Sequence, residues 1–360
     1  MRILQVNKFN YVRGGAEKYF IEIAKELERA GHQVAIFSMH HPKNIPSPWS
    51  EYFVSRISFN EGKWRDKLIS PGRILYSLEA KRKFKKIILD FKPDIIHIHN
   101  IYHQISPSIL RVAKKYNIPV IMHLHDYKLV CPNYQLFVKN KICFRCLTHK
   151  YYNCFRLKCF KNNFWSSFLA MIEMYFHHSI LKIYQKNISF FISPSQFMKK
   201  TLIKFSWPED KIKVLYNFSE KLENDSPDDW ENYALYFGRL SPEKGISLIL
   251  RAWSKIKSDT KLKIVGSGPE EDNLKKLVAS LNLNDKVDFL GPLFDQDLHK
   301  VIKKAKFVLI PSLWAENMPL SLLESLMLKK VVVASNTGVY QKLLRIKRRG
   351  FYLKTAISKI

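Results

Sequence analysis

The sequence predicts an α/β protein that contains two doubly wound domains facing each other across a cleft. Short apolar segments alternate with amphipathic helical segments, and such alternation is typical of parallel sheets. The alternation stops at an acidic segment rich in Pro and Asn and then starts again. With 360 residues, the chain is also longer than one hydrophobic core usually serves. Its composition, 46% hydrophobic and 25% charged, is typical of globular domains.

The first predicted domain covers residues 1–205. Its four clearest buried strands are RILQV at 2–6, QVAIFS at 33–38, PDIIHIHN at 93–100 and IPVIMHLHD at 118–126. Apolar residues at helical spacing follow the first strand: Ala16, Tyr19, Phe20, Ile23, Ala24 and Leu27. Gly31 is typical of the end of that helix. An insertion rich in Cys and aromatic residues is expected at about 127–184.

A linker is predicted at 206–232, and the second domain at 233–360. Its predicted strands are YALYFG at 233–238, KLKIVG at 261–266, KVDFLG at 286–291, KFVLIPS at 306–312 and KVVVAS at 330–335. Helices are expected to begin at Ile246, near Glu270, near Asp297 and at Pro319. Ligands bind at the carboxyl ends of strands in such sheets, so the cleft between the two domains is the expected site.

The net charge of +29, from 60 Lys and Arg against 31 Asp and Glu, favours an anionic partner. A membrane surface and a phosphorylated substrate both fit, and biased composition also contributes. We expect no nucleic-acid partner, because no zinc-finger or RNA-binding signature is present. The N-terminus does not resemble a signal peptide. The apolar segment at 164–181 is interrupted by Glu173, His177 and His178, which predicts a buried or membrane-surface helix. A cytoplasmic protein, peripheral on the inner face of the membrane, is therefore expected.

All five cysteines lie in the predicted insertion: Cys131, Cys143, Cys146, Cys154 and Cys159. Cys143 and Cys146 have the C-x2-C spacing that holds a tetrahedral zinc ion. The second C-x2-C pair of a zinc site is missing. A structural zinc, free thiols and disulfides therefore all remain open, although disulfides are disfavoured in a reducing compartment.

Two motifs follow strands of the second domain. In YFGRLSPEKG, Arg239 and Lys244 supply positive charge beside glycine turns at a helix start, a pattern that suits a diphosphate. In VGSGPEE, Gly266 and Gly268 allow close backbone approach, which alone is weak evidence.

The segment IPSLWAENMPLSLLESLM, residues 310–327, places Glu316 in a loop before Pro319 and Glu324 on the second turn of the next helix. A carboxylate accepts two hydrogen bonds and suits adjacent sugar hydroxyls. Taken alone, this spacing also fits a loop acid followed by a solvated helix residue.

The sequence resembles the family-4 retaining glycosyltransferases with the GT-B fold, in which two Rossmann-like domains face each other. The resemblance rests on seven motifs in the family's order: RGGAE, HD, SPSQFMKK, GRLSPEKG, VGSGPEEDNL, PSLWAENMPLSLLESL and VVASNTG. The resemblance extends to about Gly338. Within the family, the chain is similar to members that build bacterial polysaccharide or lipopolysaccharide.

The resemblance implies three sets of site residues. The catalytic set is Glu316, His125, Arg239 and Lys244. The donor-binding set is Gly15, Arg239, Lys244, Gly266, Glu316, Asn317 and Glu324, and the acceptor-side set is Gly14, Gly15 and His99. Arg239 and Lys244 would neutralise the departing diphosphate, Glu316 would meet the sugar hydroxyls, and Glu324 would bind the ribose. His123 is expected to be a strand residue. His97 and His99 form an ambiguous pair for which structural roles are favoured, and His99 is the better candidate of the two for a cleft residue.

The implied reaction is transfer of a sugar, with retention of configuration, from a UDP- or GDP-sugar to a lipid-linked or glycan acceptor. It requires no cofactor, because fixed cations take the part of a DxD-type metal. After Gly338 the match decays, and the remaining 22 residues are expected to be too few for the family's last strand and closing helices. This motivates one alternative, a catalytically impaired binding partner in a membrane-associated polysaccharide assembly complex. A sugar-nucleotide epimerase with the same fold is another.

Overall fold

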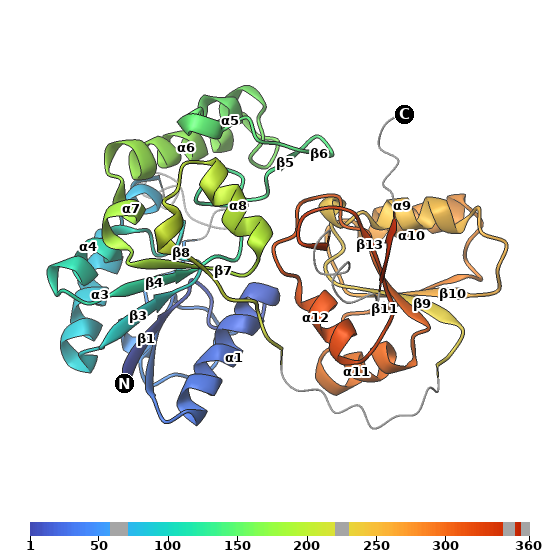
Figure 1. Ribbon diagram of the computed structural model, residues 1–360, viewed down its shortest axis with the longest axis horizontal. Coiled ribbons are helices and arrows are strands. Elements are labelled where there is room, and N and C mark those ends of the chain that lie inside the picture. The colour runs from blue at the N-terminus through green and yellow to red at the C-terminus, as the bar shows by residue number, and fades with distance from the viewer. Residues whose placement is uncertain (58–70, 220–229, 341–349, 354–360) are drawn as a thin grey trace. The chain divides into compact units, whose positions relative to one another are not determined.

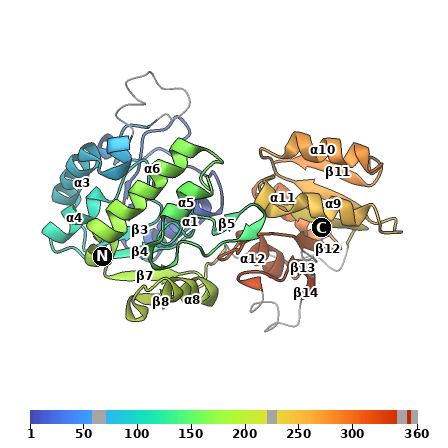
Figure 2. The same cartoon turned by 90° about the horizontal axis from the view of Figure 1, so that it is seen from above.

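The structure is a computed structural model that describes residues 1–57, 71–219, 230–340 and 350–353. The chain divides into two compact units, residues 1–136 with 143–217 and residues 137–142 with 218–360. Each unit contains a six-stranded parallel sheet with helices on both faces (Figures 1 and 2). This confirms the predicted pair of doubly wound domains.

The first sheet has the order β2-β1-β3-β4-β7-β8. Its strands are β1 (Arg2–Val6), β2 (Gln33–Phe37), β3 (Ile95–Ile98), β4 (Val120–His123), β7 (Phe190–Ser193) and β8 (Ile212–Val214). Its helices are α1 (Gly15–Arg29), α3 (Leu78–Phe91), α4 (Ser108–Lys115), α5 (Tyr152–Arg156), α6 (Phe164–Met174), α7 (Ile183–Asn187) and α8 (Gln196–Lys204). Strand β8 falls inside the predicted linker, so the first unit extends further than its predicted end at residue 205.

Different helices cover the two faces of the first sheet. Leu4 pairs in register with Ala35, and Val6 with Phe37, so these side chains share one face. Phe37 packs edge-to-face on Phe84 of α3, with ring centroids 5.0 Å apart. Gln5 points to the opposite face, which α1 covers.

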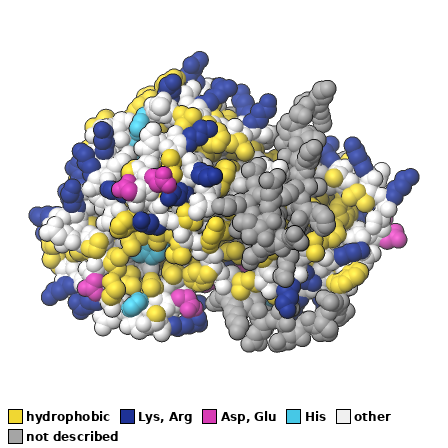
Figure 3. Space-filling view, in the orientation of Figure 1, with side chains coloured by type: hydrophobic (Ala, Val, Ile, Leu, Met, Phe, Trp, Pro, Cys, Tyr) yellow, Lys and Arg dark blue, Asp and Glu magenta, His cyan; other side chains and the backbone are white. Residues whose placement is uncertain are grey.

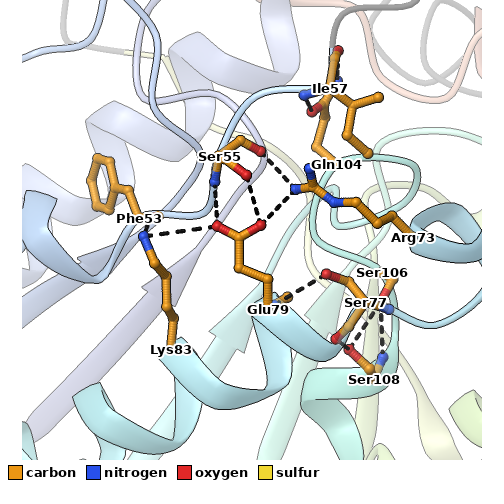
Figure 4. Close-up of polar contacts among 11 residues, drawn as sticks. Phe53, Ser55, Ile57, Arg73, Ser77, Glu79, Lys83, Gln104, Ser106 and Ser108 are labelled. Carbon is orange, nitrogen blue, oxygen red and sulfur yellow. Dashed lines mark hydrogen bonds and ion pairs between the residues drawn. The ribbon is translucent and has the colours of Figure 1, made fainter. Parts of the chain in front are cut away.

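The start of α3 is held by a polar cluster, shown in Figure 4. The Glu79 carboxylate accepts hydrogen bonds from the Ser55 backbone N–H at 2.8 Å and the Ser55 hydroxyl at 2.6 Å, and Arg73 lies 2.9 Å away. Ser77 caps the helix through the N–H of Ala80, 3.1 Å from its hydroxyl. These bonds and cations lower the pKa of Glu79 despite its partial burial, which alone would raise it.

The second sheet has the order β11-β10-β9-β12-β13-β14. Its strands are β9 (Tyr233–Phe237), β10 (Lys261–Val265), β11 (Val287–Gly291), β12 (Phe307–Ile310), β13 (Val332–Ser335) and β14 (Gly350–Leu353). Its helices are α9 (Ile246–Trp253), α10 (Glu271–Ser280), α11 (Asp295–Lys304) and α12 (Leu320–Met327). In Figure 1, α9 and α10 lie on one side of this sheet and α11 and α12 on the other. The predicted strands and helix starts of this unit are confirmed.

The chain after Gly338 contains one more strand than expected. Gly350–Leu353 pairs in parallel with Val332–Ser335 and forms the edge strand β14. The segment therefore does supply a last strand, and the expectation was wrong on that point, while the expected lack of closing helices stays a prediction. Residues 341–349 and 354–360 lie outside the described part of the chain.

The apolar segment at 164–181 forms α6 and the π-helical turn Tyr175–Ile180 that continues it. No helix in the described part of the chain is both long enough and apolar enough to cross a bilayer. Glu173 is buried within this segment, and its Oε2 lies 2.7 Å from Nζ of Lys128. The acid that interrupts the apolar run is therefore one half of a buried ion pair, which ties α6 to the loop that follows β4.

Candidate active site

Both sheets contain a topological switch point, where the connections from two neighbouring strands run in opposite directions. In the second sheet this point lies between β9 and β12, which pair side by side. In the first sheet it lies between β1 and β3. Ligands of doubly wound folds bind just beyond the strands at such points. Most of the predicted site residues lie in the loops that follow these strands.

Lys244 and Glu316 meet at the switch point of the second unit. Lys244 ends the turn after β9, Glu316 lies in the loop after β12, and Nζ is 2.6 Å from Oε1. The hydroxyl of Ser312 donates a second hydrogen bond to the same oxygen, at 2.8 Å. Glu316 is 5% exposed. A buried carboxylate that is paired in this way is held in one orientation.

Backbone contacts join the two loops that carry these side chains. The N–H of Leu313 donates to the carbonyl of Glu243 at 2.8 Å. Gly245 has φ of +70°, and a Cβ there would lie 2.3 Å from the carbonyl oxygen of Pro311. A side chain at this position would therefore push the loops apart, which explains the glycine after Lys244 in physical terms.

A third loop, after β13, is hydrogen-bonded to the backbone of the Glu316 loop. The N–H of Val339 donates to the carbonyl of Glu316 at 3.2 Å, and the Thr337 hydroxyl lies 3.2 Å from the carbonyl of Trp314. Gly338 has φ of +58°, and a Cβ there would lie 2.7 Å from both N and O of Glu316. The NTG motif is thus a backbone support for the predicted catalytic loop.

The remaining predicted donor residues of the second unit differ in exposure. Glu324 lies on the second turn of α12 and is 4% exposed, so it is not the solvated helix residue that its spacing alone would allow. Asn317 is also buried. Arg239 is exposed in the loop after β9. Their contacts with a donor stay predictions.

Gly266 has a structural role in this unit. Its φ is +133°, and a Cβ there would lie 1.9 Å from the carbonyl oxygen of Gly238. Gly268 approaches the carbonyl of Leu240 in the same way, with a Cβ distance of 2.2 Å. Both glycines let the loops after β9 and β10 touch. The predicted contact of Gly266 with the donor is a separate expectation that this packing does not test.

In the first unit, Gly14 and Gly15 form the start of α1, as the RGGAE motif predicts. Gly14 is extended, with φ of −173°, so it is not in a conformation that requires glycine. Its Cβ would meet only the Glu17 carboxylate, at 3.6 Å. Space at this position is consistent with close approach of a ligand, but the acceptor-side role of the two glycines stays a prediction.

A cluster of four imidazoles lies at the switch point of the first unit, where His99 and His123 are buried and His97 and His125 are half-buried. His99 is fully buried, with Nδ1 2.8 Å from Nε2 of His125 and Nε2 2.9 Å from Oε1 of Gln5. Burial lowers the pKa of His97 to about 3 and that of His123 to about 4. It holds the pKa values of His99 and His125 well below their usual range. The cluster is therefore neutral at physiological pH.

All five cysteines are free thiols in this structure, and Sγ of Cys159 lies 2.7 Å from Sγ of Cys154. Across the described residues, which include all five, no group of three or more His, Cys, Asp or Glu side chains is placed to hold a metal ion. The thiol of Cys131 instead donates to Oδ1 of Asn133 at 2.8 Å. A structural zinc bound by Cys131, Cys143, Cys146, Cys154 and Cys159 stays a prediction, as do the alternatives of free thiols and disulfides.

The family models match both units of the chain. The model for glycosyltransferase family 4 matches residues 13–219, and that for glycosyl transferases group 1 matches residues 218–359. The first match alone covers more than half of the chain. The protein belongs to glycosyltransferase family 4. The resemblance that the seven motifs indicated is therefore confirmed: this chain is a glycosyltransferase with the GT-B fold.

Individual relatives of this glycosyltransferase are distant. An uncharacterized 42.6 kDa protein in the cps region of Klebsiella pneumoniae is 25% identical and covers 98% of this chain and 90% of its own. An N-acetylgalactosamine-N,N'-diacetylbacillosaminyl-diphospho-undecaprenol 4-alpha-N-acetylgalactosaminyltransferase of Campylobacter jejuni is 36% identical over 37% of both chains. HepE of Anabaena, solved with UDP-glucose, shares the fold with a TM-score of 0.66 and 18% identity, covering 98% of this chain and 85% of its own.

Sequence reasoning missed several polar residues around both switch points. Ser312 and Gln5 are examples. For Gln5 the sequence does contain a signal of a polar partner, because a polar residue lies within the apolar strand RILQV. Asp126 of the HD motif was not assigned a role. Burial raises its pKa to about 6, although the Lys8 cation opposes that shift. A half-buried acid with a perturbed pKa beside His125 is typical of functional sites.

Proposed function

We propose that this glycosyltransferase moves a sugar, with retention of configuration, from a nucleoside-diphosphate sugar to a lipid-linked or glycan acceptor in cell-surface polysaccharide synthesis. The observation that supports it most is the pairing of Lys244 and Glu316 at the switch point of the second unit, 2.6 Å apart. One cation and one carboxylate in contact suit the two parts of a sugar diphosphate: the ammonium suits the phosphate oxygens and the carboxylate the sugar hydroxyls.

The charges that develop during transfer fit these groups. When the bond between the sugar and the diphosphate breaks, negative charge grows on the β-phosphate oxygen, and the Lys244 ammonium would stabilise that charge. Arg239, exposed after the same strand, would add a second cation. Attack from the face that the diphosphate leaves would retain configuration, and the departing phosphate would take the proton of the acceptor hydroxyl.

Names of relatives support the donor and acceptor classes. A protein of the same fold was solved with UDP-glucose, which favours a UDP-sugar donor. The Campylobacter relative acts on a diphospho-undecaprenol glycan, and the Klebsiella relative lies in a cps region. The Campylobacter name favours a lipid-linked acceptor, and the Klebsiella name favours a role in cell-surface polysaccharide synthesis.

The surface of α5 and α6 supports a location at the membrane. Phe164, Trp165 and Phe168 are 42%, 73% and 37% exposed, and Lys158 and Lys161 beside them are exposed as well. In Figure 3, Lys and Arg side chains are spread over the visible face of the first unit, where acidic side chains are few. Exposed aromatic rings beside cations suit an anionic membrane surface. We therefore place the protein at the inner face of the cell membrane.

A donor screen tests the proposal. The purified chain is mixed with UDP- and GDP-sugars, with and without a polyprenyl-diphosphate glycan, and nucleotide release is measured. Release that depends on the acceptor, with an α-linked product from an α-linked donor, is the expected result. Binding without release would favour the impaired binding partner, and an isomerised donor would favour an epimerase. Inversion at the transferred carbon would overturn the retaining mechanism.

A further inference from the structure

Gln5 occupies a position that no element of the predicted site explains. It is fully buried in β1 and pairs in register with His97 of β3. Paired residues of parallel strands share a face, and so do residues two apart on one strand. His99, two residues beyond His97 at the end of β3, therefore lies on the same face as Gln5.

The hydrogen bonds on this face form a chain with one direction. The Gln5 amide donates through Nε2 to Nδ1 of His97, at 3.1 Å. Its carbonyl oxygen Oε1 only accepts, so Nε2 of His99, 2.9 Å away, must carry a proton. Burial lowers the pKa of His99 well below its usual range, so this ring is neutral and has only one proton. Its Nδ1 is therefore an acceptor.

The same logic reaches His125. Nδ1 of His99 lies 2.8 Å from Nε2 of His125, and an acceptor at that distance requires a donor. Nε2 of His125 must therefore carry the proton of that ring, and its Nδ1 is an acceptor nitrogen. Aromatic packing fixes the rings: Tyr19 of α1 lies 5.7 Å from His125, and Phe20 lies 5.2 Å from His99, measured between ring centroids.

We infer that Gln5 and His99 are positioning residues that hold His125 in the tautomer protonated at Nε2. The inference rests on the proposed function, because its effect on transfer depends on His125 meeting the donor sugar. In this tautomer His125 offers that sugar an acceptor nitrogen, which suits a hydroxyl, and it has no second proton to give to a phosphate. The directing group is the Gln5 amide, which is buried in β1 and lies two hydrogen bonds away from His125.

The tautomer is measured directly on the wild-type chain. Selective ¹⁵N labelling of histidine and long-range ¹H–¹⁵N correlation distinguish protonated from unprotonated ring nitrogens, and the His125 signals are those lost in His125→Gln. We expect a protonated Nε2 and an unprotonated Nδ1. The opposite pattern, or a mixture, would overturn the inference. This result does not depend on activity, so it stays decisive even if no donor is turned over and the proposed function fails.

The positioning role is tested with Gln5→Met, which keeps the shape and removes the amide. Leu4→Met is the matched control, because Leu4 is equally buried in the same strand but points to the other face. In Gln5→Met we expect a mixed tautomer at His125 and a kcat reduced by about tenfold, as is typical for loss of an orienting partner. Leu4→Met should change neither. A wild-type tautomer together with wild-type kcat in Gln5→Met would refute the role, and if that variant does not fold, the wild-type spectrum decides.

Discussion

Nζ of Lys244 lies 2.6 Å from Oε1 of Glu316, although the two residues are 72 positions apart in the sequence. The contact joins the loops after two neighbouring strands, and it holds a cation against the carboxylate that the family resemblance assigns to the transferred sugar. In the absence of a donor, the two groups neutralise each other. A bound sugar donor would replace this contact with two others: its diphosphate would pair with the Lys244 ammonium, and its sugar hydroxyls would donate to the Glu316 carboxylate.

Removing the carboxylate should abolish transfer. For Glu316→Gln we expect kcat to fall by about 100-fold or more, because a preorganised group at the reacting sugar is lost. In Lys244→Met, kcat should fall by a similar factor, because a charge that stabilises the diphosphate is lost. Steady-state assays of nucleotide release measure both. Glu271→Gln is the control, since Glu271 forms an ion pair with Lys275 on the partly exposed surface of α10, Nζ to Oε1 2.8 Å. Full turnover by Glu316→Gln would remove the site assignment.

Gly338→Ala should damage the site through the backbone. Its Cβ would lie 2.7 Å from N and O of Glu316, so the Glu316 loop must move. We expect kcat to fall by about tenfold, since small displacements of positioning groups cost rate, and the free energy of unfolding to fall by more than in the control. That control is Gly31→Ala: its φ of +82° carries similar backbone strain, about 1 kcal/mol, but nothing lies within 4 Å of the added Cβ. Equal effects of the two substitutions on both quantities would contradict the support role.

The buried pair of Lys128 and Glu173 should matter for stability. Burial would raise the pKa of Glu173, but the nearby cations, Lys128 first, more than reverse this and lower it. Lys128→Met leaves a buried carboxylate without its main partner and should reduce the free energy of unfolding by about 3–5 kcal/mol. The double variant Lys128→Met with Glu173→Leu should recover most of the loss. Urea unfolding measures both. A double variant as unstable as the single one would show that the pair itself, not the unpaired charge, dominates.

Acid should destabilise the first unit through its imidazoles. Half-buried His97 and buried His123 have folded pKa values of about 3 and 4, below the ordinary value of 6.5, because desolvation disfavours the charged ring. Between these pH values the unfolded chain therefore binds protons that the folded chain does not bind. The free energy of unfolding falls as the pH is lowered from 6.5 to about 4, by about 1.4 kcal/mol per pH unit for each ring. Asp126, with its pKa raised to about 6, offsets one ring by gaining a proton in the folded state. Thermal unfolding across this range measures the slope, and His97→Gln should reduce it. An unchanged slope in that variant would contradict the assignment.

The aromatic surface of α6 should bind anionic membranes. Trp165→Ser removes the most exposed aromatic ring of that surface, and we expect flotation with phosphatidylglycerol liposomes to fall severalfold. Phe294→Ser is the matched control, because Phe294 is 65% exposed in the second unit, outside this surface. Flotation should also weaken with salt, since part of the attraction is electrostatic. Equal flotation of wild type with neutral and anionic liposomes would argue against a membrane surface as the partner.

The sequence by itself determined the two doubly wound units and most of their elements. Strands such as YALYFG and KFVLIPS were evident because an apolar run that ends in Gly or Pro and is followed by helical periodicity fits few other structures. It also determined the family, because seven ordered motifs carry information that no single one has. Lys244 and Glu316 could be expected to lie close together, because both follow strands that end at the same edge of a sheet.

Only the tertiary structure decided which side chains touch. That Gln5 directs His99, that Gly338 supports Glu316, and that Glu173 pairs with Lys128 depend on strand order and register, which place residues far apart in sequence within hydrogen-bonding distance. Periodicity reports which face of an element is buried, but not which element covers that face. A buried polar residue in an apolar run therefore signals that a partner exists, and only the packed chain identifies it.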